Sequence, residues 1–385
     1  MFEQKARQIE RIFLRRVNKQ NIIFTAKGKT NYIIAVRDDK YSVCTEIGNT
    51  PFTISRKAIR KAINYFIDCK TITRRSLEKY SNFTSSLLGI LIEIFKGKVM
   101  LRELESKEIR LSLLGTRLFA SGLEKDPNIR ELYKKLGGKH LLLNYFHIRG
   151  NKHWKKILDE NFHVIIDSGA FSVYRAKQKM ITRMEKDNQL SLFQHDDVEM
   201  ISLEEYASFI NKEYQDNRIK AFINLDVIGD PVQTQRNFKR LNELCPSATI
   251  WPVWQINDSL ENIETLVDEE HEVICIGGLI PLMLKDKKVA ERVLSQVLGS
   301  FPTVNFHCLG LANRWLWNMM PFSVDTTAYL NARKSEKQRK IYNVETGERV
   351  NAPSEMSTIS IIAQNLSSLL KLEKFQEKQL RLLQI

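Results

Sequence analysis

Short apolar runs alternate with longer charged stretches through most of this 385-residue chain. The runs are continuous rather than alternating, which is typical of strands buried on both faces of a parallel sheet. Most of the stretches between them carry apolar residues at helical spacing. We therefore predict an α/β domain folded as a TIM-like (β/α)8 barrel, with a doubly wound sheet as the alternative. The eight predicted strands span residues 109–115, 140–148, 162–169, 221–228, 249–256, 272–278, 303–310 and 322–328.

The N-terminal part of the chain differs in pattern and in charge. Residues 1–105 predict a basic helix, two strand-like segments and two amphipathic helices, and they hold 21 Lys and Arg against 10 Asp and Glu. The other 280 residues hold 38 against 35. An excess of this kind at one end of a chain indicates contact with a polyanion, and a basic surface that serves solubility alone is the alternative.

We expect three segments from these patterns. Residues 1–105 form a basic α+β accessory domain that could bind nucleic acid, residues 106–335 form the barrel, and residues 336–385 form an extension with an amphipathic helix. Residues 175–200 are a long charged connection, and connections of that length are usually functional or disordered.

Composition excludes several classes of protein. No apolar run reaches the roughly 18 residues of a membrane-spanning helix. The N-terminus lacks the apolar region of a signal peptide, so we expect a cytoplasmic protein without a membrane partner. The five cysteines show no paired spacing, which argues against a cysteine-rich zinc site. We expect neither a metal nor a cofactor.

Aspartates follow three of the predicted strands. Asp167, Asp226 and Asp325 each stand at the C-terminal end of an apolar run. In a β/α barrel the active site lies at these ends. A buried carboxylate is unfavourable without a partner, so three of them converging on one rim indicate chemistry. The alternative for each is a cap on the next helix.

Other residues at the strand ends suit a planar ligand. Ser168 and Gly169 are small and allow close approach to the backbone, and Phe171 could stack on a ring. Gln255 could pair with a base edge or with a neighbouring loop, and Gly277-Gly278 leaves backbone N–H groups open. Core packing is the alternative for Phe171, and it is the preferred interpretation of His307 and Cys308.

Six segments resemble, in the right order, segments of the tRNA-guanine transglycosylase superfamily. The branch that installs 7-deazaguanines in the DNA of phages and bacteria is the closer match. The resemblance covers roughly residues 109–335. The segments are DSGAFS (167–172), NLDVIGDP (224–231), VWQ (253–255), IGGL (276–279), CLGL (308–311) and SVDTTAYLNAR (323–333).

The resemblance implies a role for each of these residues. Asp325 would attack the anomeric carbon and form a covalent glycosyl ester, and Asp167 would move protons on the leaving and incoming bases. Phe171 and Leu309 would sandwich the base. Its edge would be read by Asp226, Gln255 and the backbone around Gly277, Gly278 and Leu279. Independently of the resemblance, base loss passes through an oxocarbenium-like state, which needs a carboxylate and a proton donor.

Two departures from the tRNA-acting enzymes favour DNA as the substrate. No cysteine follows Cys308, so their zinc site after the nucleophile cannot form, and their Pro-Thr-Arg triplet is missing after Asp325. The expected partners are DNA, with tRNA as the alternative, and a free 7-deazaguanine base. A homodimer, helper proteins, a catalytically inactive nucleic-acid-binding homologue and an unrelated nucleoside hydrolase stay open.

A basic cluster after the nucleophile segment could contact nucleic acid, although a solvated face is an equal alternative. Its members are Arg333, Lys334, Lys337, Arg339 and Lys340.

Overall fold

The described residues form two compact units. The first contains the chain up to Gly115 together with residues 299–301 and 374–382, and the second contains Thr116–Leu298 and Val304–Glu373. The computed structural model describes residues 2–48, 50–69, 71–96, 98–104, 106–113, 115–186, 201–269, 271, 273–301, 304–311, 313–314, 319, 321–335 and 338–382.

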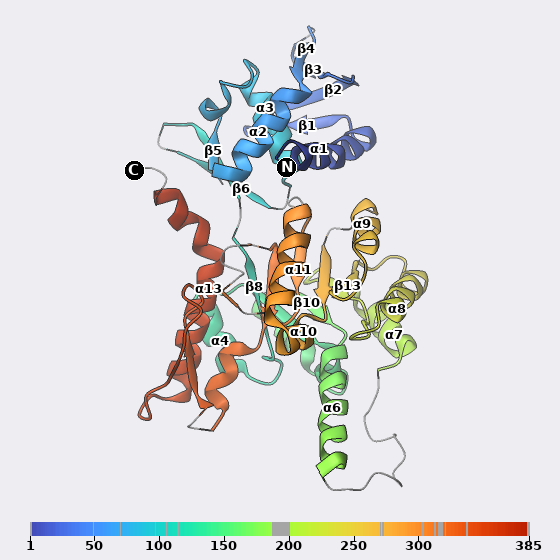
Figure 1. Ribbon diagram of the computed structural model, residues 1–385, viewed down its shortest axis with the longest axis vertical. Coiled ribbons are helices and arrows are strands. Elements are labelled where there is room, and N and C mark those ends of the chain that lie inside the picture. Colours follow the sequence, from blue (N-terminus) through green and yellow to red (C-terminus); the bar gives the residue numbers. More distant parts are fainter. Residues whose placement is uncertain are drawn as a thin grey trace. The chain divides into compact units, whose positions relative to one another are not determined.

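In the first unit, helices cover one face of a four-stranded antiparallel sheet of order β1-β2-β3-β4 (Figure 1). Ile23, Ile33, Val43 and Ile54 alternate inward from these strands and pack with the helices in one apolar core. A second antiparallel sheet has the order β5-β7-β6. The elements are α1 (Phe2–Lys19), β1 (Ile22–Phe24), β2 (Thr30–Val36), β3 (Lys40–Thr45), β4 (Phe52–Ser55), α2 (Arg56–Cys69), β5 (Thr71–Thr73), the 3-10 helix η1 (Arg75–Leu77), α3 (Thr84–Ile94), β6 (Val99–Glu103) and β7 (Ile109–Leu113).

The second unit is a nearly closed parallel barrel with helices outside it, as predicted. Its nine strand segments have the order β12-β11-β10-β9-β8-β16-β15-β14-β13. The strands are β8 (Arg117–Ser121), β9 (His140–Asn144), β10 (His163–Asp167), β11 (Ile219–Ile223), β12 (Ile250–Trp251), β13 (Val253–Gln255), β14 (Ile274–Gly277), β15 (Phe306–Cys308) and β16 (Ser323–Thr326).

Pro252 explains why nine segments make eight strand positions. Proline has no N–H for a sheet ladder, and it separates β12 from β13 within one extended run. β12 pairs with β11 and β13 pairs with β14, both in parallel. The two halves of this run therefore join the two ends of the sheet.

The prediction for the first barrel strand was wrong. Residues Ile109–Leu113 form β7, which pairs antiparallel with β5 and β6 in the first unit. The barrel instead begins with β8, which lies parallel between β9 and β16. The run in β8 is short and has Arg117 and Ser121 at its ends, although its middle residues are buried. Because its ends are polar, β8 does not appear in the sequence as a long apolar run.

Helices and turns follow the barrel strands. Asp126, Ser202, Asp230 and Ser259 each cap the helix after them by accepting a backbone N–H. The elements are α4 (Pro127–Lys135), α5 (Tyr145–Ile148), η2 (Trp154–Glu160), α6 (Ala170–Lys186), α7 (Leu203–Glu213), α8 (Pro231–Leu244), α9 (Leu260–Asp268), α10 (Leu279–Lys285), α11 (Lys287–Ser300), η4 (Ala328–Arg333), β17 (Lys340–Tyr342), β18 (Arg349–Asn351) and α13 (Thr358–Leu382).

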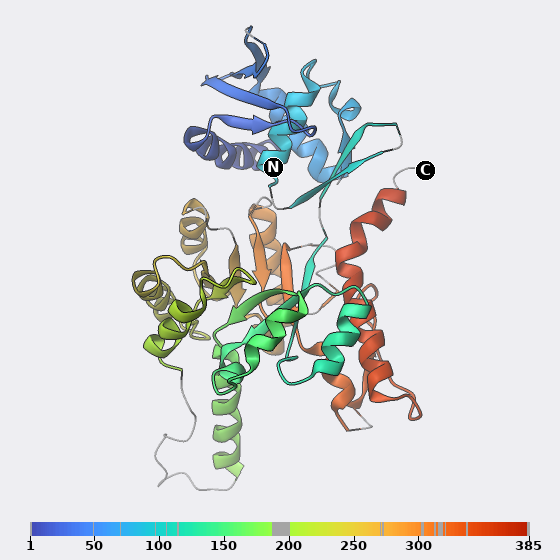
Figure 2. The same ribbon diagram turned by 180° about the vertical axis from the view of Figure 1, so that it is seen from behind.

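Helix α13 is part of the predicted C-terminal extension, and it lies beside α4 in both views (Figures 1 and 2). Its Glu373 Oε1 accepts the Leu118 N–H of β8 at 2.9 Å and lies 3.1 Å from His140 Nδ1. In the described part of the chain, no helix combines the length and apolarity that crossing a bilayer requires.

Candidate active site

A pocket of about 1090 Å³ opens at the C-terminal ends of the barrel strands, and Asp167, Asp226 and Asp325 all line it. Its volume is in the range of small-molecule sites. Parallel strands present their C-terminal ends to the same rim, which is why residues far apart in sequence meet here. The capping alternative does not account for Asp226, because Asp230 caps the helix that follows it.

Asp325 is held by donors from two neighbouring strands. Its Oδ1 accepts the Gly310 N–H at 2.6 Å, and its Oδ2 accepts the Ser121 hydroxyl at 3.1 Å. His307 Nε2 lies 3.5 Å from Oδ1. Only 8% of Asp325 is exposed. These donors fix the direction of the Asp325 carboxyl group at the pocket wall.

Asp167 ends β10 just before α6, and its surroundings favour the protonated form of its carboxyl group. Its Oδ2 accepts the Gly169 N–H at 3.0 Å. Burial, followed by the charges of Asp226 and Asp325, raises the pKa of Asp167 to about 8. The side chain therefore holds its proton at neutral pH, as a general acid needs.

Asp226 and Gln255 form a second polar wall. Gln255 Nε2 donates to Asp226 Oδ2 at 2.7 Å, and Gln255 is fully buried. Burial raises the pKa of Asp226 to about 6, against the hydrogen bond from Gln255, which lowers it. Asp226 is therefore mostly ionised at pH 7. Gln255 Oε1 is buried and has no hydrogen-bond partner, and Gln255 is not among the residues that line the pocket. Gln255 therefore lies behind Asp226, and the Asp226 carboxylate is the acceptor that this wall offers to the N–H groups of a ligand.

Two glycines let that wall approach the pocket closely. A Cβ at Gly277 would lie 2.9 Å from Gln255 Nε2, and a Cβ at Gly278 would lie 2.8 Å from Gln255 Oε1. Gly278 has φ +71, a conformation that other residues rarely adopt. Both glycines line the pocket, as does Leu279, the first residue of α10.

The predicted stacking residues also line the pocket. Phe171 on α6 and Leu309 after β15 belong to its wall. The Phe171 ring is stacked near Tyr174, with the centroids 6.3 Å apart, and the Arg175 guanidinium lies 5.9 Å from the Phe171 centroid. These groups give the pocket a flat apolar surface beside a cation.

Ser168 and Gly169 lie behind this wall rather than on it. Ser168 is fully buried, and its Oγ has no hydrogen-bond partner. Gly169 has φ +93, and a Cβ there would lie 2.5 Å from Asn144 Oδ1 and 2.6 Å from Phe146 Cβ. Gly169 is therefore required for the turn that places Asp167. Neither residue is among those that line the pocket.

The sequence patterns did not single out Ser121, Glu124 and Asn144, although all three line the pocket. Glu124 Oε1 accepts the Asn144 N–H at 2.9 Å. Ser121 and Glu124 follow β8, which the pattern did not identify as a barrel strand. A polar Ser and Glu directly after a short apolar run are the signal that could have found them.

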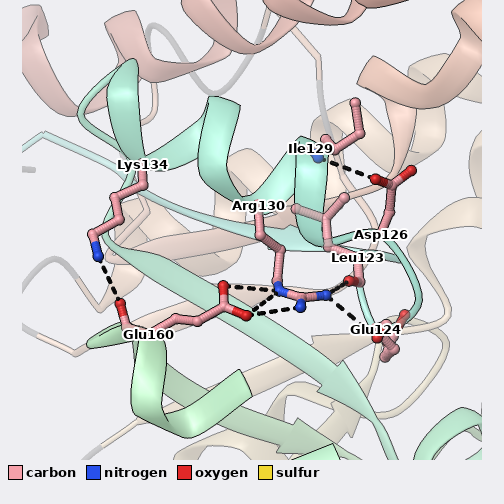
Figure 3. Close-up of polar contacts among 7 residues, drawn as sticks. All are labelled: Leu123, Glu124, Asp126, Ile129, Arg130, Lys134 and Glu160. Carbon is pink, nitrogen blue, oxygen red and sulfur yellow. Dashed lines mark hydrogen bonds and ion pairs between the residues drawn. The ribbon is translucent and has the colours of Figure 1, made fainter. Parts of the chain in front are cut away.

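Arg130 on α4 fixes the loop that carries Glu124 (Figure 3). Its Nη1 donates to the Leu123 carbonyl at 2.6 Å, and its Nη2 donates to Glu160 Oε1 at 2.7 Å. The arginine is buried, so this ion pair ties the pocket rim to η2 with little competition from water.

The predicted basic cluster lies away from the pocket wall and is partly engaged within its own unit. Arg333 pairs with Asp126, Arg339 donates to the Met356 carbonyl, and Lys340 donates to Asn351. Lys334 is exposed, and Lys337 lies outside the described residues. A role of this cluster in binding nucleic acid stays a prediction.

The described residues contain no group of three or more His, Cys, Asp or Glu side chains arranged to hold a metal ion. What the pocket does bring together is a protonated carboxylic acid, a carboxylate held by donors, an acceptor wall and an aromatic ring. Neither the protein-family models nor the curated proteins include a match to this chain.

Proposed function

We propose that this protein exchanges a nucleobase in a nucleic acid by breaking and re-forming an N-glycosidic bond. In the form we favour, guanine in DNA is replaced by a free 7-deazaguanine base. One observation carries the proposal: two carboxyl groups in different surroundings line one pocket, Asp167 with its pKa raised by burial and Asp325 held by the Gly310 N–H and the Ser121 hydroxyl. Such a pair is what substitution at an anomeric carbon requires.

The first half of the exchange would use both groups at once. An Asp325 oxygen attacks C1′ while the bond from C1′ to the base breaks. The proton of Asp167 passes to the departing base, which leaves neutral. Asp325 becomes a glycosyl ester, and Asp167 becomes a carboxylate.

The second half reverses these roles. The incoming base attacks C1′ through its ring nitrogen, and its N–H proton passes to Asp167. The bond between C1′ and the Asp325 oxygen breaks, and the electron pair returns to the carboxylate. Two displacements on the same carbon retain its configuration.

The polar wall would select the base. The ionised Asp226 carboxylate, oriented by the Gln255 Nε2 that donates to its Oδ2, accepts hydrogen bonds, so it suits the N–H groups on the edge of a guanine-type base. Phe171 and Leu309 would enclose its ring, as flipped bases are held elsewhere.

Binding of the polymer would draw on the basic first unit. Part of its charge is neutralised internally, since Arg56 and Arg60 both pair with the buried Glu10. Lys27 and Lys29, in the exposed turn between β1 and β2, stay available at the surface. Replacing a lysine that binds a phosphate should reduce the slope of log affinity against log salt concentration by about 0.9 for duplex DNA.

The direct test incubates duplex DNA with the protein and a 7-deazaguanine base, and then measures the nucleosides by mass spectrometry. A 7-deazaguanine deoxynucleoside that forms with the native protein and not with Asp325→Ala supports the proposal. A parallel reaction with tRNA distinguishes the two polymers. Absence of the modified nucleoside from both would refute the proposal.

A further inference from the structure

His307 is a buried titratable residue that the proposed reaction leaves unused. It stands in the middle of β15 and is completely buried. Its ring lies edge-on to Phe119, with the centroids 5.6 Å apart, and 5.9 Å from the Trp251 ring centroid. Both neighbours belong to the apolar interior of the barrel. An imidazole in such a place needs partners for its nitrogens.

The nearest polar groups belong to two residues of the neighbouring strand: Ser323 makes a hydrogen bond with Nδ1, whereas Nε2 makes no hydrogen bond and has Asp325 near it. Ser323 and Asp325 are two positions apart on β16, so their side chains point to the same face. His307 Nδ1 lies 2.8 Å from Ser323 Oγ. His307 Nε2 lies 3.5 Å from Asp325 Oδ1. The imidazole thus connects a serine within the barrel to the carboxylate at the pocket.

The chemistry of these groups decides where the hydrogen lies. A carboxylate only accepts, so a lone pair on Nε2 facing Asp325 would be repelled, whereas an Nε2–H is attracted. The Ser323 hydroxyl can donate to Nδ1 and thereby favours the hydrogen on Nε2. Ser323 therefore sets the tautomer of His307, and His307 presents a donor to Asp325.

We propose that His307 is a positioning residue, oriented by Ser323, that stabilises Asp325 as a carboxylate relative to its glycosyl ester. The inference rests on the proposed function. A donor interacts more strongly with a charged oxygen than with an ester oxygen. His307 therefore favours the second displacement, in which the bond from C1′ to Asp325 breaks, the electron pair returns to the carboxylate and the base proton goes to Asp167.

The test compares His307→Phe, which keeps a ring and removes the donor, with His307→Gln, which keeps an N–H. His153→Phe, at an exposed histidine, is the control. His307 Nε2 approaches Asp325 Oδ1 at 3.5 Å without a hydrogen bond in the structure, so we expect kcat in His307→Phe to fall by at most about tenfold, which is the lower end for a bond to a charged group. KM should change little. The fraction of protein trapped as a covalent adduct under denaturing conditions should rise.

The variants have an expected order. His307→Gln should recover most of kcat, and Ser323→Ala should lie between it and His307→Phe, because the tautomer is then no longer set. If adduct fraction and kcat in His307→Phe match those in His153→Phe, the inference is overturned. If His307→Phe does not fold, an adduct fraction in Ser323→Ala that is unchanged from the native protein overturns it.

A measurement without turnover separates this inference from the proposed function. The ¹⁵N resonances of the His307 ring, assigned by their loss in His307→Phe, should report the hydrogen on Nε2 in the native protein and a mixture of tautomers in Ser323→Ala. A hydrogen on Nε2 without base exchange would refute the proposed function and retain the donor that His307 presents to Asp325. A hydrogen on Nδ1 in the native protein refutes the positioning role.

Discussion

Asp167→Asn should stabilise the fold while it removes activity. The side chain is nearly isosteric, and the amide oxygen can still accept the Gly169 N–H that Asp167 accepts at 3.0 Å. The substitution removes a group that burial and two neighbouring carboxylates make unfavourable to ionise. Exchange should slow by about 10²–10⁴-fold, as is typical when a general acid is removed.

The size of the stability change follows from the two pKa values of Asp167. The pKa is about 8 in the folded chain against an ordinary 3.8. Between these values the folded chain keeps a proton that the unfolded chain has released, so stability falls as pH rises. One pKa unit corresponds to about 1.36 kcal/mol, so the penalty is below about 1 kcal/mol at pH 4 and up to about 4 kcal/mol at pH 7.

The assay is urea unfolding at several pH values between 4 and 8, followed by tryptophan fluorescence. All five tryptophans lie in the sequence of the barrel unit, so the signal reports that unit. The advantage of Asp167→Asn over the native protein should grow with pH through this window. Asp216→Asn is a control of opposite sign, because hydrogen bonds from Arg218 lower the pKa of Asp216. That variant should be less stable than the native protein at pH 7, and the difference should vanish as pH falls below about 4.

Two results would contradict this reasoning. A stability difference for Asp167→Asn that does not change with pH would mean that the carboxyl group titrates normally in the folded state. A variant less stable than the native protein at pH 7 would mean that the ionised form is favoured, and Asp167 could then not serve as the acid.

Three further predictions concern other parts of the site. Asp325→Asn should abolish exchange and covalent trapping and leave polymer binding near normal, as measured by fluorescence anisotropy of labelled DNA. Gly278→Ala should lower stability by about 1–3 kcal/mol and raise KM for the base, since its Cβ would lie 2.8 Å from Gln255 Oε1. The control is Gly137→Ala, which has a positive φ and no neighbour within 4 Å of the added Cβ, so it should lower stability and leave KM unchanged. Arg130→Leu should cost about 1–3 kcal/mol in urea unfolding, because it removes charge-assisted hydrogen bonds to the partly exposed Glu160 and the hydrogen bond to the Leu123 carbonyl.

The barrel could be predicted largely because its strands are buried on both faces. The three central residues of HVIID and all four residues of ICIG are buried in the fold, and continuous apolar sequence is what that environment selects. The first strand was placed wrongly because β7 packs its Leu111 into the core of the first unit. An apolar residue in the sequence does not indicate which of two cores it belongs to. Pairing partners depend on tertiary contacts that a single segment does not encode.

The site was predictable where a polar residue interrupts an apolar run. Asp167, Asp226 and Asp325 stood out for that reason, and they do line one pocket. Ser121 and Glu124 did not stand out, because their strand was not recognised. The link from His307 to Asp325 was also missed. His307 belongs to a buried run, and nothing in its spacing distinguishes a histidine that packs from one that reaches a carboxylate on the next strand.

The apolar interior and the acidic rim depend on each other. Side chains such as Phe119, Ile165 and Trp251 fill the barrel below the pocket, and the low polarity there makes ionisation of Asp167 unfavourable. The same low polarity strengthens each hydrogen bond that Asp325 accepts. The same core surrounds both carboxyl groups, and their hydrogen-bond partners differ: a single backbone N–H for Asp167, against the Gly310 N–H, the Ser121 hydroxyl and the nearby His307 for Asp325. A polar substitution in this core should therefore lower the pKa of Asp167 and reduce the stability that Asp167→Asn gains at pH 7 in urea unfolding.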